Sequence, residues 1–128
     1  MTQFLAASLA LAFIACSNQR DRAGATLEKV GAAQLRRDAA LLYKRLFAGH
    51  GTDFVVVRAK DWPESFQRFS PLRVGAYPDG ISLALESKDS GESGLYVVPA
   101  TMEHQPSAAQ GGKFQRMADG VYWYSFGD

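Results

Sequence analysis

Apolar residues recur at helical spacing in one stretch of the sequence. That stretch is bounded by Thr26, a suitable N-cap, and by Gly49-His50-Gly51, a clear stop signal. Its apolar residues fall on one stripe of a 3.6-residue helix: Leu35, Ala39, Leu42 and Leu46. Its basic residues lie off this stripe and are expected to face water: Arg36, Arg37, Lys44 and Arg45. The pattern predicts one long helix over residues 26–48.

After this stretch the pattern changes to short apolar runs separated by turn signals. Residues 54–57, Phe-Val-Val-Val, are typical of a buried strand. Residues 61–64, Asp-Trp-Pro-Glu, resemble a helix start with Asp61 as the cap. They predict a short helix near 62–69, which ends before Ser70-Pro71.

The remaining apolar runs predict strands joined by tight turns. Residues 72–77 and 81–86 flank Pro78-Asp79-Gly80, and 94–99 form the next run. Residues 114–117 and 121–126 flank Ala118-Asp119-Gly120, an Asp-Gly hairpin signal. The fold class predicted is α+β, with one long N-terminal helix packed on a mainly antiparallel sheet of about five or six strands.

Length and charge limit the classes of protein. A chain of 128 residues has room for one domain, and its net charge of +1 argues against a general nucleic-acid binder. Residues 16–60 hold nine Lys/Arg against four Asp/Glu, and residues 61–128 hold five against nine. This asymmetry suits a solvated helix face beside an acidic sheet rim. It also suits a basic half that lies near anionic lipid or an acidic partner.

The first fifteen residues form a leader. Residues 4–15, FLAASLALAFIA, are uncharged and too short to span a bilayer, but they match the apolar core of a signal peptide. Phe13-Ile14-Ala15-Cys16 resembles the lipobox of bacterial lipoproteins. The resemblance implies cleavage between Ala15 and Cys16, and lipid on the Cys16 sulfur that anchors the chain to a membrane.

Two positions depart from the lipoprotein pattern. Phe13 stands where the family usually has Leu. Met1-Thr2-Gln3 lacks the Lys or Arg that the family usually has near its start, which a wrongly assigned start would explain. Ordinary secretion, or a buried N-terminal helix with an inert core cysteine, are the alternatives. By the family's sorting rule, Ser17 favours the outer membrane, facing the periplasm, over the inner membrane. The expected layout is a signal peptide over 1–15, a polar tether over 16–25 and one domain over 26–128.

The second half resembles a group of small uncharacterised bacterial α+β proteins. The resembling segments are Trp62-Pro63, Leu72-Arg73-Val74, Gly80-Ile81, Gly94-Leu95-Tyr96-Val97 and Gly120-Val121-Tyr122-Trp123-Tyr124. These are turn glycines and strand aromatics, which specify a fold. The resemblance implies no activity.

Candidate chemistry is sparse. One cysteine excludes an internal disulfide, no Gly-x-Ser-x-Gly elbow is present, and Gly111-Gly112-Lys113 lacks the spacing of a phosphate loop. His50, Asp53 and His104 could form a small polar site, but polar loop residues in water explain them better. We therefore expect no catalytic residue, no metal and no cofactor.

The last strand carries the strongest sequence signal for binding. Alternation places Tyr122, Tyr124 and Phe126 on one sheet face and Trp123 on the other. An exposed Tyr/Trp surface is typical of recognition patches. Alternatively, the long loop, or the short helix carrying Trp62 and Phe66, covers this face as a second small core.

The sequence as a whole predicts a non-enzymatic, membrane-anchored envelope lipoprotein. Its partner would be an envelope protein or a cell-wall component, bound through the sheet. The alternative is a small enzyme or ligand carrier with a site around His50, Asp53 and His104. The oligomeric state stays open.

Overall fold

Two helices meeting at Gly31 form most of one layer of the molecule. The computed structural model describes residues 18–47, 54–88, 91–103, 106 and 112–127. Helix α2 spans Gln19–Val30 and helix α3 spans Ala32–Leu46. Gly31 lies between them with φ 87°, a left-handed conformation that glycine adopts without strain, and its N–H donates to the Leu27 carbonyl. The predicted single helix over 26–48 is therefore wrong, because the chain turns at residue 31.

The predicted tether over 16–25 is also wrong from residue 19 onward. The side chain of Asn18 accepts a hydrogen bond from the Asp21 N–H at 2.9 Å and so caps α2. Ala23 and Leu27 then bury one side of this polar helix against the sheet. On α3 the predicted apolar stripe is confirmed: Leu35, Ala39 and Leu42 are buried, and Leu46 packs beside them.

A short irregular segment follows the first strand on the helix side. The 3₁₀ turn η1 spans Ala59–Asp61 and helix α4 spans Glu64–Gln67, within the predicted range 62–69. Pro63, not Asp61, is the cap of α4, since Asp61 belongs to η1. The Ser65 hydroxyl donates to Asp38 at 2.6 Å and ties α4 to α3.

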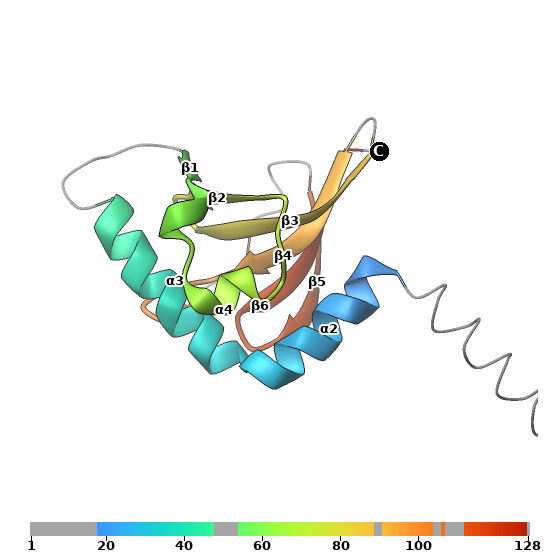
Figure 1. The fold of residues 1–128 in the computed structure, drawn as a ribbon, viewed down its shortest axis with the longest axis horizontal. Helices are drawn as coiled ribbons and strands as arrows, with labels where there is room; N and C mark the ends of the chain where they lie inside the picture. The colour runs from blue at the N-terminus through green and yellow to red at the C-terminus, as the bar shows by residue number, and fades with distance from the viewer. Residues whose placement is uncertain (1–17, 48–53, 89–90, 104–105, 107–111, 128) are drawn as a thin grey trace, which may run out of the picture.

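The sheet has six antiparallel strands in the order β1-β2-β3-β4-β6-β5 (Figure 1). They are β1 Val55–Val57, β2 Arg73–Tyr77, β3 Gly80–Lys88, β4 Gly91–Val97, β5 Lys113–Ala118 and β6 Val121–Phe126. The fold is α+β, as predicted, and both predicted turns join hairpins, β2–β3 and β5–β6. Strand β1 was predicted to be buried but is an edge strand, with Val56 61% exposed.

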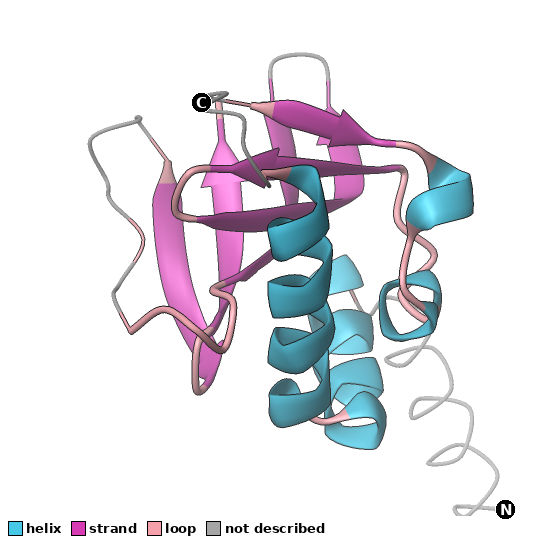
Figure 2. Cartoon of the chain, turned by 90° about the vertical axis from the view of Figure 1, so that its left-hand side faces the viewer, coloured by secondary structure: helices cyan, strands magenta, loops and turns pink. Residues whose placement is uncertain are grey.

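All described helices cover one face of the sheet (Figures 1 and 2). The core between the layers is aliphatic, with Val74, Leu83 and Leu95 opposite one another on adjacent strands and fully buried. Trp62 and Phe66 belong to this core, so the short helix does not cover the other face. Among the described residues, the far face of the sheet is covered by side chains of the strands and of the adjoining Phe54.

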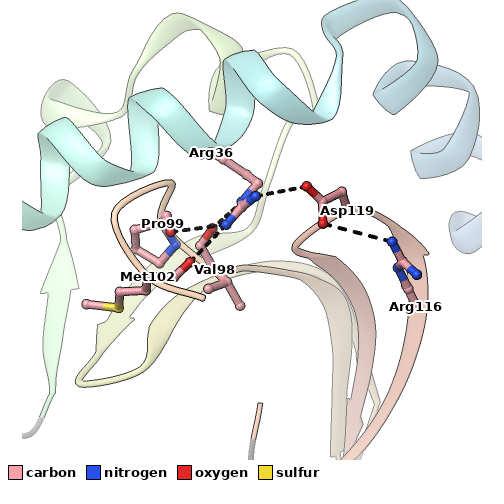
Figure 3. A network of polar contacts seen from close by, with 6 residues as sticks. All are labelled: Arg36, Val98, Pro99, Met102, Arg116 and Asp119. Atoms are coloured by element: carbon pink, nitrogen blue, oxygen red, sulfur yellow. Dashed lines mark hydrogen bonds and ion pairs between the residues drawn. The ribbon is translucent and has the colours of Figure 1, made fainter. Parts of the chain in front are cut away.

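Arg36 fastens α3 to the opposite end of the chain (Figure 3). Its side chain was expected in water but is only 15% exposed. Its guanidinium donates to the carbonyl oxygens of Val98 at 2.9 Å and Met102 at 3.0 Å, and to Asp119 at 3.1 Å. A Cβ at Gly120 would lie 2.3 Å from the Arg36 Nε atom, so this turn needs glycine both for contact and for its φ of +70°. The contacts make Arg36 a structural residue.

Candidate functional site: the open aromatic face

The sheet face opposite the helices carries aromatic side chains from five strands or their flanks. We call it the open face. Cross-strand register aligns Tyr96 with Tyr122, and Phe114 with Tyr124, on this face. Ring contacts run without a gap from the β1 edge to the β5 edge. Their centroid distances are Phe54–Tyr77 4.8 Å, Tyr77–Tyr96 6.2 Å, Tyr96–Phe114 5.3 Å, Tyr96–Tyr124 6.2 Å, Phe114–Phe126 6.0 Å and Tyr124–Phe126 4.9 Å.

Small residues on the same face make room for these rings. A Cβ at Gly80 would lie 2.4 Å from the Tyr96 ring, and one at Gly75 would lie 2.7 Å from the Phe54 ring. The rings therefore lie flat over backbone that has no side chain. Glycine inside a strand often marks such a close approach, and this was the signal in the sequence that could have located Tyr96 and Phe54.

The centre of the open face is closed to solvent and its rim is not. Tyr96 is 2% exposed and Tyr124 is 0% exposed. Phe54 is 47% exposed, and the other rim rings are partly exposed: Tyr77, Phe114, Tyr122 and Phe126. The row is therefore a small second core with ring edges that a partner can reach at both ends.

Polar groups under the rings are paired with one another. Glu92 accepts hydrogen bonds from the Tyr124 hydroxyl at 2.5 Å and from Arg73. The Tyr96 hydroxyl donates to Asp79. Burial raises the pKa of Tyr96, and the hydrogen bond to Asp79 raises it further. Burial also raises the pKa of Tyr124 well above its ordinary value. Both hydroxyls therefore act as neutral donors at physiological pH.

The four residues predicted as a binding surface separate on the structure. Alternation is confirmed: Tyr122, Tyr124 and Phe126 lie on the open face, while Trp123 pairs with Leu95 and packs on the aliphatic core. Tyr124 is fully buried, in keeping with the alternative of a second small core, and Trp123 is partly exposed on the helix side of the sheet. Tyr122 and Phe126 keep accessible edges.

The other predicted positions lie outside the described residues. These are Ala15, Cys16, His50, Asp53 and His104. Within the described ranges, no three His, Cys, Asp or Glu side chains are grouped as metal ligands would be. No helix among those same ranges is long and apolar enough to cross a membrane.

Comparison with known proteins gives no match to a family model, a curated protein or a solved structure.

Proposed function

We propose that this chain is an exported lipoprotein, anchored by lipid on Cys16, whose domain is a non-catalytic binding module. The segment FLAASLALAFIA before Cys16 supports export and lipidation. Ser17 supports the outer membrane, facing the periplasm, as the site of the anchor. The partner is an envelope protein or a cell-wall component, and the open face is the surface that contacts it.

The observation that carries the binding role is the uninterrupted row of rings with accessible edges. Tyr and Phe provide large contact area at small cost in side-chain entropy, and they are enriched where proteins bind. The centre of the row is fixed by burial and hydrogen bonding, since Tyr96 and Tyr124 are buried there and donate to carboxylates. Since Glu92 and Asp79 are engaged in those pairs, this face is better suited to recognition than to acid–base chemistry.

The anchor is tested by mass spectrometry and cell fractionation. The purified mature protein should begin at Cys16 and carry the mass of a diacylglyceryl group, and it should fractionate with membranes. The Cys16→Ser variant should leave the membrane fraction as a soluble periplasmic protein or stay unprocessed. An unmodified thiol at residue 16 that is still joined to Ala15 would overturn the anchor.

The binding surface is tested by photo-crosslinking in intact cells. A photoreactive phenylalanine analogue at position 122 should give one discrete adduct with a protein or with glycan. The same analogue at Leu41, which is 69% exposed on α3, is the matched control and should give none. Equal adducts from both positions, or none at position 122, would contradict the proposed surface.

A further inference from the structure

A groove separates the start of α2 from the edge strand β5. It has a volume of about 760 Å³. Its floor is made by small side chains and Met117, whose Cε lies 3.5 Å from where a Gly24 Cβ would stand. Two arginines line it from opposite walls, Arg20 on α2 and Arg116 on β5. The groove therefore lies between α2, at the beginning of the described chain, and the β5 edge of the sheet.

We propose that this groove and the flanking β5 edge dock on the anionic phospholipid headgroups of the membrane that holds the anchor. The inference rests on the proposed lipid at Cys16. Helix α2 begins at Gln19 and its cap is Asn18, two positions after Cys16. Two extended residues span at most about 7 Å. A lipid on Cys16 would therefore hold the first turn of α2, and the groove beside it, within the headgroup layer.

The charge near the start of α2, which we call the anchor end of the groove, complements an anionic lipid surface. Arg20 and Arg116 line the groove, and Arg22 and Lys113 lie outside its lining on the same helix and strand. Strand β5 has no acidic residue. The acidic groups of the groove are Asp21, beside these arginines, and Glu28, near the far end of α2. Asp119 lies 3.9 Å from Arg116 at the β5–β6 turn. The four cations of the first turns of α2 and of β5 thus exceed Asp21 and Asp119 by two charges, and anionic headgroups would neutralise this excess.

The exposed side chains of strand β5 give a second reason to expect the lipid surface at this edge of the sheet. It is an outer strand with exposed side chains at Lys113, Gln115 and Arg116. Cationic side chains on an edge discourage pairing with another strand, which argues against an added peptide as the occupant. They are compatible with a lipid surface, where long basic side chains reach the phosphates. Docked this way, the β1 edge stands about 24 Å from the membrane, because five strand spacings separate it from β5.

Fluorescence quenching on vesicles tests this orientation. The lipidated full chain is reconstituted in phosphatidylcholine vesicles with or without 30% phosphatidylglycerol. An environment-sensitive dye is placed at Gln115→Cys on β5 or at Val56→Cys on β1, and a headgroup-linked spin label is the quencher. With phosphatidylglycerol present, the dye at position 115 should be quenched strongly and the dye at 56 weakly. The difference should disappear in 0.5 M salt or in pure phosphatidylcholine.

Charge reversal identifies the residues responsible. Each cation near an anionic surface contributes about fivefold to partitioning, so Arg20→Glu/Arg116→Glu should lower the docked-to-undocked ratio at least about 25-fold. Arg37→Glu/Lys44→Glu is the matched control, since both side chains are exposed on α3. The control should dock like the parent. Equal effects of the two double variants, or equal quenching at positions 115 and 56, would overturn the proposal.

The experiments distinguish an absent lipid anchor at Cys16 from a groove that does not bind headgroups. Mass spectrometry of the same preparation reports lipid on Cys16. If that lipid is absent, flotation of the full chain with phosphatidylglycerol vesicles still tests the groove. Binding that Arg20→Glu/Arg116→Glu abolishes would support headgroup docking without an anchor, and no flotation would refute it. Capture of an extended peptide in the groove, unaffected by lipid, would also refute it.

Discussion

The two faces of the sheet are built from different residues by the same strands. The face under the helices is aliphatic, with Val74, Leu83 and Leu95 interlocked and fully buried. The open face is aromatic, with Tyr96 and Tyr124 at its centre and rings with accessible edges around them. Adjacent residues of one strand therefore serve different layers, as Tyr122 and Trp123 do on β6.

This difference follows from what covers each face. The helices pack their own side chains against one face of the sheet. Branched aliphatic residues on the strands are therefore sufficient to fill the space between the two layers. The described part of the open face has no helix over it, so large rings that lie across glycines must cover the sheet themselves. Stability should therefore depend mainly on the aliphatic face, and recognition on the rim of the aromatic face.

Removing a side chain from the centre of the aliphatic face should have the largest effect. Leu83→Ala leaves a cavity under the helices and should lower the free energy of unfolding by about 3–4 kcal/mol. Chemical denaturation followed by circular dichroism measures this. Leu41→Ala, at an exposed position on α3, is the control and should change stability by less than about 0.5 kcal/mol. Similar losses of unfolding free energy in both variants would refute the proposal that the aliphatic face dominates stability.

Cutting the connection between the helix layer and the sheet should cost slightly less. Arg36→Ala leaves the Val98 and Met102 carbonyls without their donor and should lower stability by about 2–3 kcal/mol. Arg36→Lys keeps the charge but not the fork of donors, so its loss should be intermediate. Arg37→Ala, one position away and exposed, should be nearly neutral. A neutral Arg36→Ala would show that the contacts in Figure 3 contribute little.

The aliphatic half of this comparison was largely predictable from the sequence. Leu35, Ala39 and Leu42 follow the helical period, and Asp79-Gly80 and Asp119-Gly120 mark their turns. Local pattern was sufficient there because each signal acts within a few residues. It failed for α2, where a polar composition predicts a tether. That helix is held by two buried side chains, by Val30 packed against the core and by the cap at Asn18.

The aromatic half depends on contacts that local pattern does not encode. Alternation on β6 places Tyr122 and Tyr124 together correctly. Tyr96 and Phe114 join them only because β6 inserts between β4 and β5. The long connection after β4 leaves that strand order open, so the sequence alone gives neither the ring row nor the burial of Tyr124.

Alkaline pH should weaken the aromatic face. The pKa values of Tyr96 and Tyr124 are raised by burial, whereas an unfolded tyrosine ionises near its ordinary pKa of about 10. The folded state therefore keeps protons that the unfolded chain loses. This stabilising contribution is complete below pH of about 10 and is lost as pH rises above it, by about 1.4 kcal/mol per pH unit for each tyrosine.

The pH effect is assigned by measuring unfolding between pH 9 and 11 in single variants. Tyr96→Phe and Tyr124→Phe should each reduce the slope, and the double variant should keep only the contribution of Tyr43, whose pKa burial also raises. Tyr122→Phe is the comparison on the same strand. A slope unchanged in the double variant would mean that other groups govern alkaline unfolding.

Truncation at the rim should have the smallest effect on stability and the largest effect on binding. Tyr122 is only partly buried, so Tyr122→Ala should cost about 0.5–1 kcal/mol, the size of a cross-strand pair. The same change should remove most of the capture of the protein's partner, because an accessible aromatic edge supplies contact area that Ala lacks. Trp123→Phe, the adjacent residue on the aliphatic face, should lower stability and leave capture intact. If capture instead follows stability across both variants, the rings form a second core and nothing more, and recognition must be sought elsewhere on the molecule.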